Sequence, residues 1–243
     1  MPQDQFRGWV ADIYDESDGE MFAPEVIDQT VGFLVDAAAG GAALEFAIGT
    51  GRIALPLSRA GVRVAGVDIS PDMVAHLKAK PGGDAIDVTI GDYANAKVAG
   101  TFALVYIVFN SISNATTQDE QVACFTNAAA HLAPGGRFVV ELWLPDLQRL
   151  PPGETVRAFA HTATHLGFDT LDVATQQGAS HHYYLDGARF RYVDFPFRYA
   201  WPAELDLMAR LAGLRLRERF ADWDRSPFTS ASTKHVSVWE KPA

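Results

Sequence analysis

The sequence predicts an α/β fold, in which a mixed sheet of seven strands is flanked by helices and a β-rich insertion follows the fifth strand. Three observations support this prediction. Short apolar runs alternate with amphipathic segments over residues 24–141, which is typical of parallel strands connected by helices. Residues 150–201 instead contain strand-like runs separated by turn residues. The remaining tail has the pattern of a helix, a strand, a long loop and an antiparallel edge strand.

Periodicity and turn residues give the expected elements of the first half. The helix that begins at Pro24 is expected to end before Gly40-Gly41, because proline suits a first helical turn and glycine suits a helix end. In chain order we then expect strand 43–48, helix 52–59, strand 62–67, helix 71–79, strand 86–90, strand 102–109, helix 118–132 and a fifth strand that ends at residue 141.

The insertion is expected to contain strands 156–161, 168–174, 181–185 and 190–199, separated by Gly167, Gln176-Gln177-Gly178 and a hairpin turn at Asp186-Gly187. A helix at 202–213 and strands at 214–220 and 235–240 complete the chain. We therefore predict one domain from residues 1–149 and 202–243, with residues 150–201 as an insertion. Such an insertion either roofs a substrate pocket or pairs two subunits, and the sequence leaves both open.

The segment from Ala43 to Ser70 carries the clearest functional signal. After an apolar strand, Gly49-Thr50-Gly51 turns the chain so that backbone N–H groups and the next helix N-terminus face the strand end. Asp68 then follows the second strand, at the edge of an open sheet where ligands lie, and its carboxylate can accept hydrogen bonds from a ribose diol. This arrangement indicates a nucleotide-type cofactor.

Two cofactor classes compete for this segment. Residues 49–54 fit the loose G-x-G-x-x-A dinucleotide pattern, which keeps an NAD(P)-dependent oxidoreductase as an alternative. Three features favour another class: Glu45 inside the first strand, Gly91-Asp92-Tyr93 after the third, and the helix end, tight turn and strand over residues 132–141. Taken together, residues 40–145 resemble the class I S-adenosylmethionine-dependent methyltransferases, whose fold is Rossmann-like.

The resemblance implies S-adenosylmethionine as the cofactor and assigns it a set of contact positions. They are Tyr14, Glu45, Ala47, Gly49, Gly51, Asp68, Ile69, Met73, Gly91, Asp92, Tyr93, Phe109 and Asn110. It implies that Asp68 binds the ribose hydroxyls, that Asp92 accepts from the adenine amino group and that Asn110 borders the transferable methyl. Ala47 departs from the family, which usually has glycine there; the extra methyl is tolerable if φ is negative.

The function that follows is methyl transfer to a hydroxyl or amine of a small molecule, by in-line displacement with proximity as the main contribution. Where a general base is needed, the candidates are His181 and His182 on the insertion and Glu141 at the end of the fifth strand. Alternation along the strand points the two histidines to opposite faces. Each histidine has a hairpin-surface alternative, and Glu141 has the alternative of capping a backbone group. A cofactor-binding protein without transferase activity is a further alternative.

Composition limits the partners. The 20 basic and 30 acidic residues give a formal net charge of −10, which disfavours nucleic acid. We expect a small-molecule acceptor, no membrane contact, a cytoplasmic location and no metal. The sequence leaves a homodimer as an open alternative for the oligomeric state. Cys124 is the single cysteine and is expected to be a small core residue.

Overall fold

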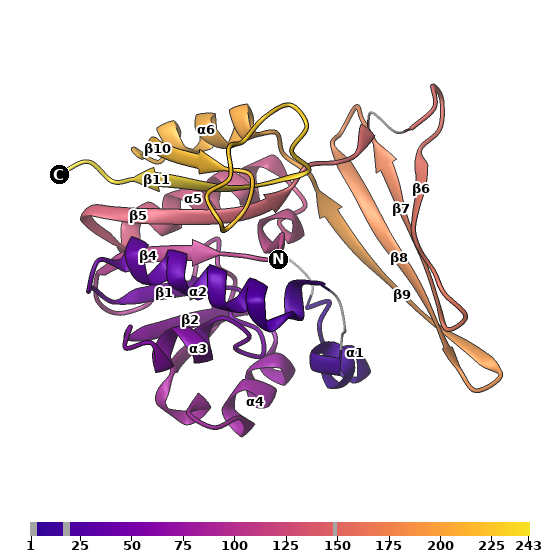
Figure 1. The fold of residues 1–243 in the computed structure, drawn as a ribbon, viewed down its shortest axis with the longest axis horizontal. Coiled ribbons are helices and arrows are strands. Elements are labelled where there is room, and N and C mark those ends of the chain that lie inside the picture. Colours follow the sequence, from indigo (N-terminus) through magenta and orange to yellow (C-terminus); the bar gives the residue numbers. More distant parts are fainter. Residues whose placement is uncertain (1–3, 17–19, 148–149) are drawn as a thin grey trace.

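A computed structural model describes residues 4–16, 20–147 and 150–243. Two sheets organise these residues, one of seven strands and one of four (Figure 1). The larger sheet is flanked by helices, and the smaller antiparallel sheet follows its fifth strand in sequence. The predicted α/β fold, a Rossmann-like mixed sheet with a β-rich insertion, is confirmed.

The elements of the larger sheet are interleaved with helices along the chain. They are α1 (Trp9–Ile13), η1 (Tyr14–Glu16), η2 (Glu20–Phe22), α2 (Pro24–Ala38), β1 (Ala43–Phe46), α3 (Ala54–Arg59), β2 (Val64–Asp68), α4 (Pro71–Ala79), η3 (Gly83–Ala85), β3 (Asp87–Ile90), β4 (Phe102–Ile107), η4 (Ser111–Asn114), α5 (Gln118–His131) and β5 (Leu132–Trp143). The second sheet and the tail add β6 (Val156–His161), β7 (His165–Asp172), β8 (Gln177–Asp186), β9 (Arg189–Arg198), α6 (Pro202–Leu211), β10 (Arg215–Phe220) and β11 (Lys234–Glu240).

The larger sheet has the strand order β10-β11-β5-β4-β1-β2-β3, in which β1 to β5 are parallel and β11 is antiparallel to both of its neighbours. The closing strand is therefore not an edge strand, and that expectation was wrong. The burial of the side chains explains why β11 is an inner strand and β10 is the edge strand. Residues 235–239 of β11 are buried on both faces, whereas Arg215 and Arg217 of β10 are exposed. Charged side chains suit an edge strand, because they discourage pairing with another chain.

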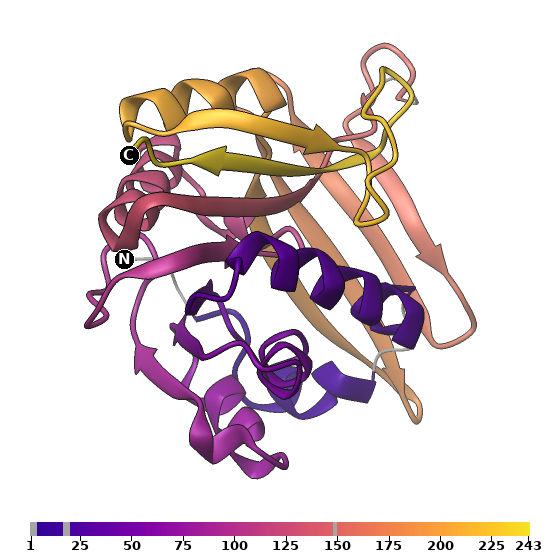
Figure 2. The same cartoon turned by 60° about the vertical axis from the view of Figure 1, so that its left-hand side comes forward.

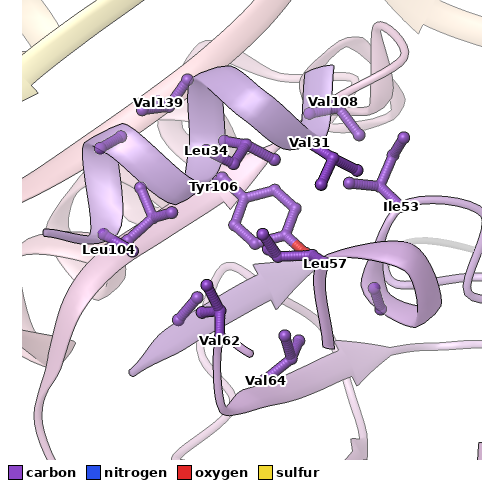
Figure 3. Close-up of a cluster of buried hydrophobic side chains, with 14 of the residues drawn as sticks. Val31, Leu34, Ile53, Leu57, Val62, Val64, Leu104, Tyr106, Val108 and Val139 are labelled. Carbon is purple, nitrogen blue, oxygen red and sulfur yellow. The ribbon is translucent and has the colours of Figure 1, made fainter. Parts of the chain in front are cut away.

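Helices cover both faces of the sheet and enclose two apolar clusters. One cluster joins α2 and α3 to side chains such as Leu104 and Val139, with the Tyr106 ring at its centre (Figure 3). The other joins α5 and α6 to the opposite face of the same strands, and Cys124 lies inside it as expected. In Figure 2, α2 crosses the near face of the sheet. This two-sided burial explains why the central strands are almost continuously apolar.

Strand ends differ from the predictions where the backbone leaves the extended conformation. The first strand stops at Phe46 because Ala47 has a φ of 56°, and the fourth stops at Ile107 before Phe109 (φ 55°) and Asn110 (φ 61°). These positive φ values turn the chain at the carboxyl edge of the sheet. The irregular residues are therefore gathered on the side where a ligand is expected to bind.

The four strands of the second sheet pair in the order β6-β7-β8-β9. The hairpin turn predicted at Asp186-Gly187 is confirmed, since β8 and β9 pair in register up to Asp186 and Arg189 and Gly187 has a φ of 62°. The two other breaks lie earlier than predicted, at residues 162–164 and 173–176, so Gln176 lies in a turn whereas Gly167 and Gly178 lie inside strands. The Phe159 ring occupies the space above Gly167, and the Phe197 ring occupies the space above Gly178. At both positions glycine makes room for an aromatic ring.

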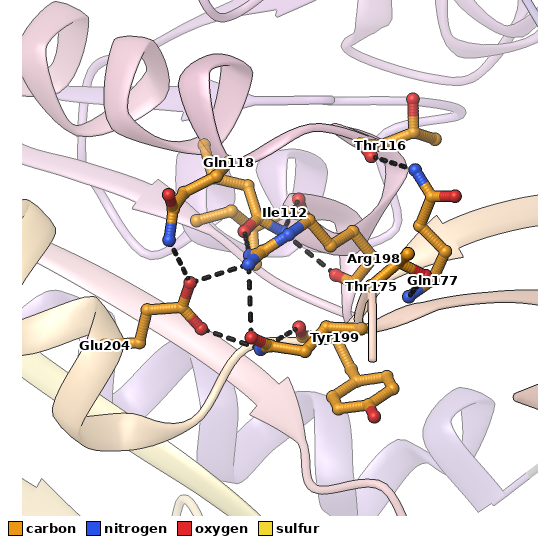
Figure 4. Close-up of polar contacts among 10 residues, drawn as sticks. Ile112, Thr116, Gln118, Thr175, Gln177, Arg198, Tyr199 and Glu204 are labelled. Atoms are coloured by element: carbon orange, nitrogen blue, oxygen red, sulfur yellow. Dashed lines mark hydrogen bonds and ion pairs between the residues drawn. The ribbon is translucent and has the colours of Figure 1, made fainter. Parts of the chain in front are cut away.

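A buried ion pair attaches the end of β9 to the helices of the larger sheet (Figure 4). Arg198 donates to Glu204 on α6 at 2.7 Å and to Gln121 on α5 at 2.6 Å. The Gln121 side chain in turn donates to the Arg198 carbonyl at 2.9 Å, and Gln176 donates to Glu204 at 2.8 Å. These contacts fix where the chain returns from the second sheet to the first.

Candidate active site

A pocket lies at the carboxyl edge of β1, β2 and β3, under the N-terminal segment. The residues that line it come from these strand ends, from that segment, and from η4 and α5. They are Gln5, Phe6, Tyr14, Ala47, Gly49, Asp68, Ile69, Met73, Asp92, Tyr93, Ser111, Asn114, Ala115 and Glu120. Eight of the thirteen predicted cofactor positions are in this lining. Parallel strands bring their ends to one edge, so residues far apart in the chain meet here.

Asp68 is the acidic group at the end of β2. It is 7% exposed, and its two oxygens accept backbone hydrogen bonds, from Gly49 N–H at 2.6 Å and from Ser70 N–H at 2.8 Å. Burial raises the pKa of Asp68, while these two hydrogen bonds act in the opposite direction. A backbone hydrogen bond from Ile69 acts in the same direction, and because a carboxylate has about four acceptor positions, acceptor capacity remains beside these three bonds.

The loop after β1 bends sharply through three residues with positive φ: Ala47 at 56°, Gly49 at 56° and Gly51 at 79°. Gly51 lies outside the lining, and a Cβ there would come within 2.7 Å of the Leu77 side chain on α4. Its role is close packing of the loop on the helix. The Ala47 methyl group was expected to be tolerable at a negative φ, but the φ of Ala47 is positive. Ala47 therefore has a strained backbone conformation.

Glu45 lies behind the loop and does not line the pocket. It is 2% exposed, and the Tyr106 hydroxyl donates to Glu45 Oε2 at 2.8 Å. Burial raises the pKa of Glu45 to about 8, although the Tyr106 hydrogen bond and the Arg52 charge lower it. The Glu45 side chain therefore binds Tyr106 of β4 and the start of α3, next to the loop.

The opposite wall combines apolar side chains with a second carboxylate. Ile69 and Met73 follow β2, and Asp92 and Tyr93 follow β3. Asp92 Oδ1 accepts from Ala94 N–H at 2.8 Å, and the Tyr93 hydroxyl donates to the Ser111 carbonyl at 3.1 Å. Gly91 is outside the lining, where its N–H donates to the Asp68 carbonyl at 2.8 Å. This wall offers an apolar slot, formed by the Ile69 and Met73 side chains, together with a carboxylate.

Phe109, Asn110 and Glu141 form a structural unit next to the pocket but outside its lining. Glu141 is 1% exposed and accepts from Phe109 N–H at 2.8 Å and from the Trp223 indole at 2.9 Å. Asn110 Oδ1 accepts from Trp143 N–H at 3.1 Å. Burial raises the pKa of Glu141. Because both of its oxygens hold structural donors, the geometry favours the capping role for Glu141 over general-base catalysis.

The N-terminal segment covers the pocket. Ser70 Oγ donates to the Phe6 carbonyl at 2.7 Å, and Thr50 Oγ1 donates to Asp15 at 2.6 Å. Tyr14 lies between the rings of Phe6 and Phe22, with centroids 6.0 and 5.7 Å away. Burial raises the pKa of Tyr14 to about 12. The segment is thus fastened to both the glycine loop and the start of α4.

Comparisons with known proteins agree on one family. A methyltransferase-domain family model matches residues 43–136. The solved structure of the CcbJ methyltransferase from Streptomyces caelestis is 37% identical, covers 96% of each chain and superposes with a TM-score of 0.87. The chain belongs to the class I S-adenosylmethionine-dependent methyltransferases.

Two further relatives of this methyltransferase have more specific names. The cypemycin N-terminal methyltransferase of a Streptomyces species is 28% identical over 215 residues, which are 83% of this chain and 84% of that protein. A dTDP-3-amino-3,6-dideoxy-alpha-D-glucopyranose N,N-dimethyltransferase from Streptomyces fradiae is 27% identical over 199 residues, 74% of this chain and 77% of that protein. These matches exclude the oxidoreductase alternative and the alternative of a protein without transferase activity.

The cofactor of the methyltransferase is S-adenosylmethionine, and the pocket fits its chemistry. The open acceptor positions of Asp68 suit a ribose diol, and the apolar slot suits an adenine ring. No group of three metal-ligating side chains gathers in the part of the chain that the structure describes. Within the same residues, no helix combines the length and apolarity needed to cross a membrane.

The two histidines proposed as bases lie on opposite faces of β8, as the alternation predicted. The His181 ring contacts Phe168 and Tyr192, and the His182 ring contacts His165 and Phe195. Neither histidine lines the pocket, and the strand of the second sheet that contacts η4 is the edge strand β9. A catalytic role for His181 or His182 stays a prediction that this lining does not support.

Sequence reasoning missed several lining residues, namely Gln5, Asn114, Ala115 and Glu120. One signal could have indicated the last of them. Thr117 and Glu120 form a capping box, in which Glu120 N–H donates to Thr117 Oγ1 at 3.2 Å and Thr117 N–H donates to Glu120 at 3.1 Å. That pattern marks a helix N-terminus directly after the fourth strand, at the ligand-binding edge of the sheet. Gln5 has no comparable local signal.

Proposed function

We propose that this methyltransferase transfers a methyl group to the amine nitrogen of a small molecule. One observation carries the choice of an amine over a hydroxyl: among the residues that line the pocket there is no histidine, and Tyr14 has a pKa of about 12. A hydroxyl acceptor must lose its proton during attack and needs a base whose pKa is near the working pH. An amine that binds as its ammonium loses one proton to solvent before attack, and the neutral amine then attacks with its own lone pair and needs no base in the transition state.

Two further points support a small-molecule amine. The N-terminal segment roofs the pocket, which leaves little access for a folded protein or a nucleic acid. The names of the two curated relatives refer to an N-terminal group and to an amino sugar whose methylation is at nitrogen, and both groups are amines. The formal net charge of −10 also disfavours a polyanionic acceptor.

We assign the cofactor contacts by position in the pocket. Asp68 holds the ribose hydroxyls, Ile69 and Met73 pack on the adenine, Asp92 accepts from the adenine amino group, and Tyr14 covers the methionine end beside Ala47 and Gly49. Glu45, Gly51 and Gly91 shape the loops around the cofactor, while Phe109 and Asn110 form the wall behind it.

The chain contributes alignment and exclusion of water to the reaction. When bound, S-adenosylmethionine supplies a methyl group already activated by a positively charged sulfur. Tyr14 and Phe6 shield the pocket from solvent, which favours a near-attack geometry between the acceptor nitrogen and that methyl. Attack by the neutral amine leaves the product nitrogen as a methylated ammonium, which exchanges its proton with solvent, so the step requires no histidine in the described lining.

A paired-acceptor assay tests this function. The protein and S-adenosylmethionine are incubated with methyl glucosaminide and, separately, with methyl glucoside, which differ only in an amine for a hydroxyl. Mass spectrometry with fragmentation locates the added methyl group. We expect N-methylation of the amine and no product from the hydroxyl sugar. Methylation of the hydroxyl sugar, or of an amino sugar at oxygen only, would overturn the proposal.

A further inference from the structure

A second hollow adjoins the cofactor pocket, along the edge of β9. Its lining comes from the N-terminal segment, from η4 and the start of α5, and from β8 and β9. The residues are Asp4, Gln5, Arg7, Asn114, Thr116, Glu120, Gln177, Gly178, Val193, Asp194, Pro196 and Phe197. Its volume of ≈ 560 Å³ falls in the range of about 300–1,000 Å³ that small-molecule sites occupy.

Three residues belong to both linings: Gln5, Asn114 and Glu120. Gln5 is distinctive among them, because its Oε1 is buried and has no hydrogen-bond partner among the described residues. Buried polar atoms without a partner are rare in folded proteins, and a ligand that donates a hydrogen bond is one explanation. Gln5 therefore lines both spaces with a side-chain carbonyl oxygen whose hydrogen-bonding capacity is unused.

The charges around the hollow restrict its occupant. Asp4, Glu120 and Asp194 line it together with a single basic residue, Arg7. Amide and hydroxyl side chains of Asn114, Thr116 and Gln177 supply further polar groups. Carboxylates attract an ammonium and repel a diphosphate, while amides and hydroxyls pair with sugar hydroxyls.

We infer that this hollow is the acceptor site, that Gln5 Oε1 accepts a hydrogen bond from the acceptor amine, and that the acceptor is a hydroxylated amine without phosphate. The inference rests on the proposed N-methylation. The inferred acceptor differs from the dTDP-linked amino sugars that the names of such relatives print. The diphosphate of those sugars would meet three carboxylates in this hollow. Gln5 is a substrate-positioning residue in this assignment.

Binding measured without turnover tests the role of Gln5. The protein is loaded with S-adenosylhomocysteine and titrated calorimetrically with methyl glucosaminide. Gln5→Met removes the carbonyl at nearly constant length and should weaken this binding about fivefold to tenfold, the size expected for one hydrogen bond. Gln5→Glu keeps an acceptor oxygen and adds a negative charge, so it should bind methyl glucosaminide at least as tightly as the unmodified chain. In Gln5→Met, affinity for S-adenosylhomocysteine should fall by a smaller factor than affinity for methyl glucosaminide, although Gln5 lines both spaces.

A second pair of variants tests the charge argument. Asp4→Asn keeps the side-chain oxygen that accepts from Phe6 N–H at 3.0 Å but removes the negative charge. It should weaken methyl glucosaminide binding and strengthen UDP-glucosamine binding, each severalfold. Asp84→Asn, which removes an equal charge outside both linings, should do neither. In the unmodified chain, UDP-glucosamine should bind at least about tenfold more weakly than methyl glucosaminide.

The outcomes separate this inference from the proposed function. If methyl glucosaminide does not bind, if UDP-glucosamine binds more tightly, or if Gln5→Met weakens only S-adenosylhomocysteine, the assigned acceptor site is wrong. The paired-acceptor assay measures N-methylation separately, so an N-methylated product there would retain the proposed function in each of these cases. Conversely, binding that depends on Gln5 but yields methylation at oxygen would retain the site and contradict the proposed amine chemistry.

Discussion

Asp68 Oδ2 accepts a 2.6 Å hydrogen bond from the backbone N–H of Gly49, so the carboxylate at the end of β2 holds the glycine loop that follows β1. The two residues are 19 positions apart in sequence and meet because β1 and β2 are adjacent parallel strands. One side chain therefore shapes the loop and keeps acceptor positions open for a ligand. Loop conformation and cofactor affinity should consequently depend on the same residue.

Replacing Asp68 by alanine should lower affinity for S-adenosylhomocysteine by about 2–4 kcal/mol, since hydrogen bonds to a charged group are the strong ones. It should also lower the free energy of unfolding by about 1–3 kcal/mol, because Gly49 N–H loses its acceptor at a site that is only 7% exposed. Calorimetry and urea unfolding measure the two effects. A folded variant with unchanged affinity would contradict the ribose assignment.

Replacing Ala47 by glycine should stabilise the protein by up to about 1 kcal/mol. The alanine has a φ of 56°, a conformation that costs an L-residue about 1–2 kcal/mol, while glycine loses about 0.5–1 kcal/mol through its more flexible unfolded chain. Ala75→Gly is the matched control, because Ala75 is exposed within α4 and should lose about 0.5–1 kcal/mol. Thermal unfolding of both variants should give changes of opposite sign.

Glu45 should make stability fall as pH rises. Its folded-state pKa is about 8 against an ordinary value of 4.5, so the folded chain binds more protons than the unfolded chain between these values. The contribution is present at the acid end of this window and is lost as pH rises toward 8. Glu45→Gln removes the titration, and the stability of the variant relative to the unmodified chain should increase across the window. Urea unfolding at both ends measures this, and a parallel pH dependence in the two proteins would refute it.

His182 should act in the opposite sense at acid pH. Burial, followed by the charges of His165 and His181, lowers its pKa from 6.5 to about 4. The unfolded chain then binds more protons between these values, so the contribution is complete above 6.5 and is lost as pH falls toward 4. His182→Asn should flatten this loss in thermal unfolding, while loss of the exposed His161 on β6 should not. Catalytic rate should change little, since His182 does not line either pocket.

The buried pair of Arg198 and Glu204 should matter far more than an exposed pair. Arg198→Met leaves the Glu204 carboxylate and the Gln121 oxygen without their charged donor and should cost about 3–5 kcal/mol. Arg217 lies on the edge strand β10, where its side chain is 44% exposed, and Arg217→Met removes its pair with Glu240 of β11, which should cost at most about 1 kcal/mol. Urea unfolding compares the two variants. Equal losses would mean that the Arg198 contacts do not hold the second sheet in place.

Most of the fold could be predicted because local sequence patterns indicate its helices, strands and turns. Helix α4 and strand β6 have the predicted bounds, and the glycine turn, Asp68 and the Asp186-Gly187 hairpin lie where their residue types indicate. Periodicity and turn chemistry depend on neighbours a few residues apart, so they are readable from one chain. Cofactor positions such as Asp68 and Asp92 could be predicted for the same reason, since strand ends of a parallel sheet share an edge.

By itself, the sequence determined the element order, the parallel core and the acidic strand ends. Only the tertiary structure decided that β10 rather than β11 is the edge strand, that Glu45 lies behind the loop, and that Glu141 caps Phe109 N–H. It also decided that Gln5 reaches the boundary of two pockets while the histidines of β8 do not. These facts depend on which distant side chains fill the same space. Packing and hydrogen-bond satisfaction between remote segments decide them, and local sequence patterns do not encode those contacts.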